Sequence, residues 1–138
     1  MRGLHIIRSR RAASRLNSRG TEVLELALIM PILLSLVFGT IEFGYFFYLQ
    51  HNLQAAAREG ARAGVPLGAT TGDATAKATA FLQNANLNPT SYSISVTSSG
   101  NNLTCTVQAS WGNVGTHLLF IPNTKIVRGS AVMRKEGT

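Results

Sequence analysis

The feature that most constrains this sequence is an apolar run of 24 residues, Leu26–Leu49, in which Glu42 is the one charged residue. At ~1.5 Å per residue, an α-helix of this length reaches across the ~30 Å hydrocarbon core of a bilayer. Charged residues make up 14% of the 138-residue chain, which is well below the share usual in soluble domains. The run therefore predicts a membrane-spanning helix at about residues 26–49.

Basic residues are concentrated ahead of this run. Residues 1–20 contain six arginines and no acidic residue, so nearly all of the formal net charge of +7 lies there. By the positive-inside rule, this distribution predicts a cytoplasmic N-terminus and an extracytoplasmic C-terminal part. Because the remaining chain carries almost no net charge, the composition does not favour nucleic-acid binding, and we expect no nucleic-acid partner.

The junction between the arginines and the apolar run differs from an ordinary secretory signal. The run is longer than the apolar region of a signal peptide, no Ala-x-Ala site closes it, and Glu22 and Glu25 precede it. The pair Arg10-Arg11 would suit a twin-arginine signal, but the apolar run begins 15 residues later. Cleavage by signal peptidase is therefore not expected.

The segment Ser18–Glu25 instead resembles the processing site of type IV prepilins and pseudopilins. A basic leader ends at Gly20, and Glu25 follows five residues later at the start of the hydrophobic helix. The resemblance implies that prepilin peptidase cuts after Gly20 and leaves Thr21 as the first residue. Glycine suits such a site because it lacks Cβ and lets the chain approach a protease closely. The alternative is that Gly20 ends a disordered arm and Glu25 lies among lipid headgroups.

Four segments resemble, in the same order, the TadE-like proteins, which are minor pilins or pseudopilins of tight-adherence pilus systems. They are Val23–Leu34 with Pro31, Ile41–Gly44 with Glu42, Phe43 and Gly44, Ala56–Arg62 with Arg58, Glu59, Gly60 and Arg62, and Gly129–Glu136. Tyr45 stands where the family often has arginine, so no role of that arginine is transferred.

The resemblance implies a pilus component that serves adhesion and biofilm formation. Its implied partners are prepilin peptidase, other pilin and minor pilin subunits, the pilus assembly platform in the inner membrane and, before assembly, membrane lipid. The major pilins of such systems are far shorter than 138 residues, so the length favours a minor subunit.

Beyond the membrane, small and apolar residues continue at steps of three and four and predict one helix over about Thr21–Ala63. They are Phe46, Leu49, Leu53, Ala56, Ala57, Gly60 and Gly64. Such a helix is roughly 43 residues or ~65 Å long, so its distal third must pack against something other than lipid. Pro31 within it removes one backbone hydrogen bond and favours a kink. We interpret Arg58–Arg62 as a packing and helix-end motif, with direct partner binding as the alternative.

Residues 65–138 predict a small extracytoplasmic α+β domain. Residues Thr70–Asp73 favour the start of a helix that ends near Asn86. The alternating segments Tyr92–Val96 and Leu103–Ala109 predict a β-hairpin, and Lys125–Lys135 a third antiparallel strand. Cys105 is in phase with the hairpin's apolar face, so we expect it to be buried, and the apolar Leu118–Ile121 should lie on the sheet.

The expected fold is therefore pilin-like: a long N-terminal transmembrane and spine helix, then a small domain with a second helix and about three antiparallel strands. The expected organisation is a cleaved leader at 1–20, the long helix at 21–64 and the α+β domain at 65–138.

Catalysis is not expected. After residue 60 the acidic residues are Asp73 and Glu136, the one histidine is His117, and no nucleophile, phosphate-binding or zinc motif occurs. We expect no catalytic residue, cofactor or metal. The alternative function is a signal-anchored, single-pass membrane protein whose outer domain binds a partner without any filament; such a protein would keep its arginine-rich leader.

Glu25 is the residue that we predict to act in assembly. A carboxylate at the end of an apolar helix is costly to draw into a helix bundle unless a cation meets it. Cleavage after Gly20 would create that cation as the amine of Thr21 on a neighbouring subunit, mostly protonated at neutral pH. The alternative is that Glu25 stays at the membrane surface and matters little.

Overall fold

The computed structural model describes residues 10–118 and 120–136, with side chains from Gly20 onward. Residues 1–9 of the predicted leader, Leu119, and residues 137–138 lie outside the described part of the chain. The chain divides into two units, Met1–Phe38 and Gly39–Thr138. The second unit contains the distal part of the long helix as well as every element that follows it.

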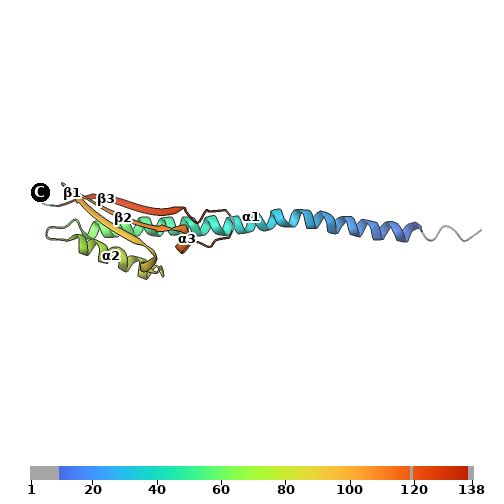
Figure 1. Ribbon diagram of the computed structural model, residues 1–138, viewed down its shortest axis with the longest axis horizontal. Helices are drawn as coiled ribbons and strands as arrows, with labels where there is room; N and C mark the ends of the chain where they lie inside the picture. The colour runs from blue at the N-terminus through green and yellow to red at the C-terminus, as the bar shows by residue number, and fades with distance from the viewer. Residues whose placement is uncertain (1–9, 119, 137–138) are drawn as a thin grey trace, which may run out of the picture. The chain divides into compact units, whose positions relative to one another are not determined.

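Helix α1 runs from Arg10 to Ala63 (Figure 1) and ends where the sequence predicts, before Gly64-Val65-Pro66. It begins eleven residues earlier than expected, because residues 10–19 are rich in arginine and alanine, which favour helix. The helix continues through Pro31, whose carbonyl accepts a hydrogen bond from Ser35 Oγ at 2.8 Å. At its C-terminal end, the Gly64 amide donates to the Gly60 and Ala61 carbonyls, both at 3.2 Å.

Helix α2, Thr71–Asn84, confirms the predicted second helix. Its N-terminus is a capping box: Thr70 Oγ1 accepts from the Asp73 amide at 3.2 Å, and Asp73 Oδ2 accepts from the Thr70 amide at 2.8 Å. The buried face of α2 repeats every four residues, at Ala74, Ala78 and Leu82. Ala80 lies off this face and is exposed.

The three predicted strands are confirmed. A short 3-10 helix, η1 (Pro89–Ser91), leads into β1 (Ser93–Ser99), β2 (Asn102–Ser110) and, after a loop, β3 (Ile126–Arg134). The sheet is antiparallel in the order β1-β2-β3. Ser99 pairs with Asn102 across a two-residue turn. Gly100 supplies the positive φ, +55°, that the first central position of such a turn requires.

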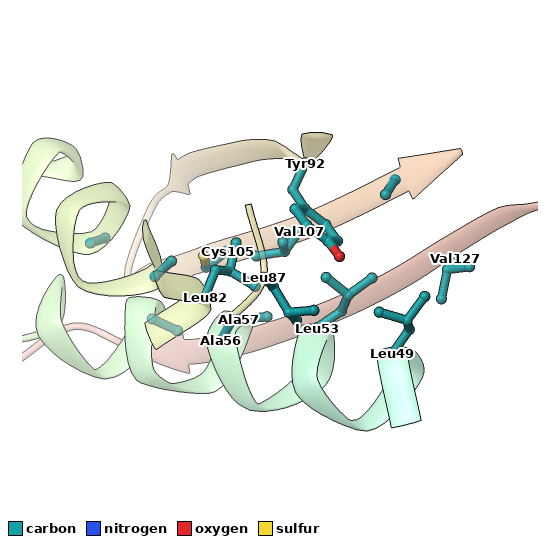
Figure 2. Close-up of a cluster of buried hydrophobic side chains, with 14 of the residues drawn as sticks. Leu49, Leu53, Ala56, Ala57, Leu82, Leu87, Tyr92, Cys105, Val107 and Val127 are labelled. Atoms are coloured by element: carbon teal, nitrogen blue, oxygen red, sulfur yellow. The ribbon is translucent and has the colours of Figure 1, made fainter. Parts of the chain in front are cut away.

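One face of the sheet packs on the distal part of α1 and on α2 (Figure 1). Side chains of α1, α2, β2 and β3 converge there, as Figure 2 shows for Leu53, Leu82, Val107 and Val127. Along β2 the residues alternate between buried and half-buried, with Leu103, Cys105, Val107 and Ala109 facing the core. The prediction that Cys105 is buried is therefore confirmed.

Strand β3 lies close to α1 and is joined to it by glutamine side chains. Gly129 lies against the backbone of Leu53 and Gln54, where any Cβ would collide with it. Gln54 Nε2 donates to the Ser130 carbonyl at 2.8 Å, and its Oε1 accepts from the Ser130 amide at 3.2 Å. Gln50 Nε2 donates to the Arg128 carbonyl at 3.2 Å. Because these backbone groups are already bonded, this stretch of the sheet edge is less open to pairing with another strand.

The segment between β2 and β3 differs from the prediction. It opens with a single helical turn, α3 (Trp111–Val114), in which Trp111 is fully buried. Ile121 packs against the core as expected, but Leu118 and Phe120 are exposed by 36% and 50%. Phe120 lies on α1 rather than on the sheet, so the expected place of Leu118–Ile121 is wrong for these two side chains. An apolar run in a loop predicts contact with another element, but it does not predict which element or which of its side chains become buried.

Candidate functional site

The predicted processing and assembly residues lie in the first unit, on the N-terminal part of α1. Gly20, Thr21 and Glu25 are exposed. Apart from its chain neighbours and the helix's own backbone, no atom of the described side chains lies within 4 Å of the position that a Cβ on Gly20 would occupy. Thr21 and Glu25 are four residues apart and therefore lie on the same side of the helix.

The apolar side chains after Glu25 are also exposed. Within the described residues, α1 has one segment long and apolar enough to cross a membrane, at Gly20–Ala63. Large apolar residues from Val23 to Phe38 lie on all sides of the helix and remain uncovered. A helix that is apolar all round requires lipid or other helices around it. The helix fits a single-pass membrane protein and does not resemble the buried helix of a soluble core.

Glu42 lies in the second unit and is fully buried. Its Oε2 accepts a hydrogen bond from the Phe120 amide at 2.6 Å. Glu42 stands four residues before Phe46 and seven before Leu49, in phase with the stripe of α1 that faces the sheet. The family resemblance identifies Glu42 without a structural role, although this spacing already places it on the packed face.

Phe43 and Gly44 follow Glu42 on outward faces of α1. The Phe43 ring stacks on the Phe120 ring with centroids 6.4 Å apart. Gly39, one turn before, leaves the space in which Phe120 lies: a Cβ on Gly39 would be 2.8 Å from Phe120 Cε2. Gly44 has no atom within 4 Å of its Cβ position. Gly39 therefore serves packing in this structure, whereas Gly44 has no packing role there.

The segment Arg58–Arg62 separates packing residues from exposed ones. A Cβ on the buried Gly60 would lie 2.9 Å from both Ala74 O and Cys105 Sγ, so this position brings α1 close to α2 and β2. Arg58 and Arg62 are exposed and Glu59 is half-buried. The two guanidinium groups are therefore on the surface, where they are accessible to a partner.

An aromatic cluster joins α1 to α3. The Trp111 ring lies 5.6 Å from that of Phe46 and 6.1 Å from that of Tyr45. Tyr45 also stacks on Tyr48 at 6.0 Å, and the Tyr48 hydroxyl donates to the Ala85 carbonyl at 3.3 Å. Trp111 was not predicted as a core residue, because it stands at a strand end where the alternation of β2 gives way to a helical turn.

Among the described residues outside the membrane run, Tyr92, Cys105 and Asp73 have shifted pKa values. Burial raises the pKa of the Tyr92 phenol to about 12, helped by the negative charges that Tyr45 and Tyr48 would carry. Burial also raises the pKa of the Cys105 thiol, which disfavours the reactive thiolate. The hydrogen bonds from the Thr70 backbone and side chain lower the pKa of Asp73. These shifts belong to packing and to a helix cap.

The described residues offer little for catalysis or metal binding. No group of three or more His, Cys, Asp or Glu side chains that could hold a metal occurs among them. An open hollow of about 640 Å³ lies beside α2 and is lined by threonine, alanine, glycine, glutamine and Val96. None of these side chains is a general acid or base at neutral pH.

Comparison with known proteins gives one match. Residues 20–62 match the family model of TadE-like proteins, which confirms the resemblance predicted from the sequence. The match indicates a protein associated with a tight-adherence pilus. TadE-like proteins are pilus components and not a family of enzymes. Neither a curated protein nor a solved structure matches the chain.

Proposed function

We propose that this TadE-like protein is a minor pilin or pseudopilin of a tight-adherence pilus. In this proposal, prepilin peptidase removes residues 1–20, and the helix from Thr21 onward enters the filament or its tip, where it serves adhesion and biofilm formation. The partners are the peptidase, the other pilin and minor pilin subunits, the assembly platform and, before assembly, the lipid of the inner membrane.

The observation that carries this proposal is the extent of the family match. The match begins at Gly20, the glycine after which cleavage is expected, and ends at Arg62, one residue before α1 ends. The matched segment is thus the helix that a pilin retains after processing. The exposed apolar surface of Val23–Phe38 supports the same function, because it suits lipid first and neighbouring helices afterwards.

The proposed topology follows from the charges at the two ends of α1. The arginine-rich residues 1–20 remain in the cytoplasm, the part at about 26–49 crosses the inner membrane, and residues 65–138 lie outside. After assembly, the outer domain is on the pilus or cell surface.

Glu25 supplies the proposed assembly contact. Its carboxylate is exposed at the edge of the apolar helix, and the amine of a processed Thr21 on a neighbouring subunit would neutralise it. Such a pair would set the axial stagger between adjacent helices. It would also favour only processed subunits, because an uncut chain has no amine at that position.

The test is a pair of glutamate variants expressed in the native bacterium. We expect Glu25→Leu to be inserted and cleaved normally, yet to be lost from sheared filament fractions, because the Thr21 amine of its neighbour finds no carboxylate. Glu22→Gln is the matched control, since Glu22 is equally exposed on the same turn of the helix, and it should assemble as the wild type does. Normal assembly of Glu25→Leu, or failure only because it is not cleaved, would contradict the charge-pairing mechanism.

A signal-anchored protein without a filament is the second candidate. The single apolar helix supports it as well, since an anchor and a pilin share this feature before assembly. The two differ in the leader: an anchor keeps its arginines, whereas a pilin loses them.

A further inference from the structure

We propose that the loop between β2 and β3 inserts its apolar tip into the outer leaflet of the membrane, as a second lipid contact of the same chain. The proposal rests on the membrane-spanning role of α1 proposed above. It goes beyond that role because it assigns lipid binding to the exposed Leu118 and Phe120 of this loop, some 70 residues after the apolar run.

The first step is the depth of Glu42. A hydrocarbon core needs about 20 helical residues. The apolar part at about 26–49 is longer than this, so a hydrocarbon core that begins between Val23 and Leu26 ends between Glu42 and Tyr45, and the residues up to Leu49 lie at the level of the headgroups. Glu42 therefore lies at the outer boundary of the hydrocarbon or less than one helical turn inside it.

The second step is that the loop is bonded at this depth. The Phe120 amide donates to Glu42 Oε2 at 2.6 Å, and the Phe120 ring stacks on Phe43 and occupies the space left by Gly39. All these residues belong to the second unit. A segment that is hydrogen-bonded to Glu42 lies at about the same depth in the bilayer as Glu42. The bond also reduces the cost of a carboxylate at that depth, since a buried charge needs hydrogen-bond donors.

The third step is the chemistry of the loop. Residues 111–124 contain no lysine, arginine, aspartate or glutamate. Leu118 and Phe120 are exposed by 36% and 50%, and the Phe120 ring stacks on the exposed Phe43 of α1. Lys125, at the base of the loop, is exposed. An apolar tip with a cation behind it is the arrangement in which acyl chains surround the tip and an anionic headgroup meets the cation.

The loop is also closed at its base, which gives the tip a defined position. The Trp111 amide donates to the Lys125 carbonyl at 2.7 Å, and the Gly112 amide to the Asn123 carbonyl at 2.9 Å. His117 Nδ1 and Asn123 Oδ1 are 2.9 Å apart and join the two arms of the loop. The Trp111 and Gly112 amides at the base are therefore satisfied within the protein, and at the tip the Phe120 amide is satisfied by Glu42, as a backbone group next to lipid requires.

The experiment measures the depth of a fluorescent label on the full chain in vesicles of phosphatidylethanolamine and phosphatidylglycerol. Cys105→Ala removes the native thiol, and Leu118→Cys carries the label. Two further variants serve as references: Leu34→Cys in the apolar run, and Asn101→Cys in the exposed turn between β1 and β2. Each label is quenched either by iodide in the water or by a spin label on the lipid acyl chain.

We expect the lipid-borne quencher to act on position 118 within about twofold of its effect on position 34, because both lie in the bilayer. Position 101 should be quenched by iodide alone. Iodide quenching at 118, with lipid quenching at 34, would overturn the loop proposal and leave the membrane span intact. Protection of 118 from both quenchers would also overturn it and would indicate a contact with protein. Aqueous labels at both 34 and 118 would overturn the span and the loop proposal together.

Discussion

Individual glycines of α1 show how side-chain size is matched to packing. Gly60 in α1 and Gly64, one residue after its end, lie where α1 meets α2 and β2, and a Cβ on Gly64 would be 3.0 Å from Leu103 Cδ2. Gly44, on the same helix, is exposed with open space around it. Glycine is unfavourable inside a helix by roughly 1 kcal/mol relative to alanine. At the buried Gly60 this cost is offset by the close packing of α1 against α2 and β2 that the missing side chain allows.

We therefore expect Gly60→Ala to destabilise the second unit by about 1–3 kcal/mol, because the new methyl group collides with Ala74 O and Cys105 Sγ. Gly44→Ala should be neutral or slightly stabilising, because it only improves helix propensity. Denaturation of the full chain in detergent, followed by the fluorescence of the single Trp111, measures both. Equal effects of the two changes would mean that the close packing at Gly60 is not present.

The buried phenol of Tyr92 predicts a pH dependence of stability. Its pKa is about 12 in the folded chain and 10.0 as the ordinary value, so the unfolded chain loses the proton first. The contribution of Tyr92 to the free energy of unfolding is fully present below pH 10. It is lost as the pH rises towards 12, by at most about 1.4 kcal/mol per pH unit.

Tyr92→Phe removes this titration. The variant should show a smaller loss of stability between pH 9 and pH 12 than the wild type, in the same denaturation measurement. Other tyrosines and lysines titrate in both proteins, so the difference between the two curves isolates Tyr92. Identical slopes would contradict the burial of its hydroxyl.

At the scale of elements, β2 is the centre of the second unit, with β1 and β3 paired to its two sides. Val107 is fully buried, whereas Thr104, on the opposite face, is half-buried. A carboxylate at position 107 has no partner in the core, so Val107→Asp should cost several kcal/mol and unfold the second unit.

Thr104→Asp is the matched control, since it adds the same charge to the same strand on its other face. It should be tolerated, with a change in the free energy of unfolding of less than about 1 kcal/mol. Protease resistance and Trp111 fluorescence report both variants. Equal damage from the two would show that both faces of the sheet are packed.

The elements themselves were largely predictable, and the failures have physical reasons. Strand alternation predicted β1 and β2, and Thr70 and Asp73 predicted the start of α2, because these signals are local. Strand β3 was predicted because two strands alone would be marginally stable. The start of α1 at Arg10 was not predicted. The expected start at Thr21 was placed at the processing motif, whereas the helix propensity of residues 10–19 extends the helix towards the N-terminus. The positions of Phe120 and Trp111 depend on which distant segment meets α1, and no local pattern encodes this.

The candidate site divides in the same way. Gly20, Thr21 and Glu25 are recognisable from the sequence through their resemblance to a prepilin processing site, because that resemblance depends only on the local order of charge, glycine and apolar helix. The contact of Glu42 with Phe120 joins residues 78 positions apart. The helical spacing predicts that Glu42 lies on the packed face of α1, but it does not predict that Phe120 is its partner. A carboxylate in phase with a packed stripe indicates a polar partner without identifying it.

At the scale of the whole molecule, the two units have different surfaces. The first unit presents an uncovered apolar helix, and the second builds a core of α1, α2 and the sheet. The residues from 65 onward are about as many as a small domain needs for one core. The distal part of α1 supplies Leu49, Leu53 and the alanines of that core, so the helix belongs to both units and its loss would unfold the second.

The central claim is that the apolar helix begins the mature chain and enters a filament. Intact-mass and N-terminal analysis of the native protein, taken separately from inner membranes and from sheared filaments, tests it most directly. We expect the filament fraction to contain only chains that begin at Thr21. Gly20→Val should leave the full-length precursor in the membrane without unfolding it, since a Cβ at position 20 would meet none of the described side chains. A native chain that keeps its arginine-rich leader, or that is absent from filaments although it is cleaved, would contradict the account.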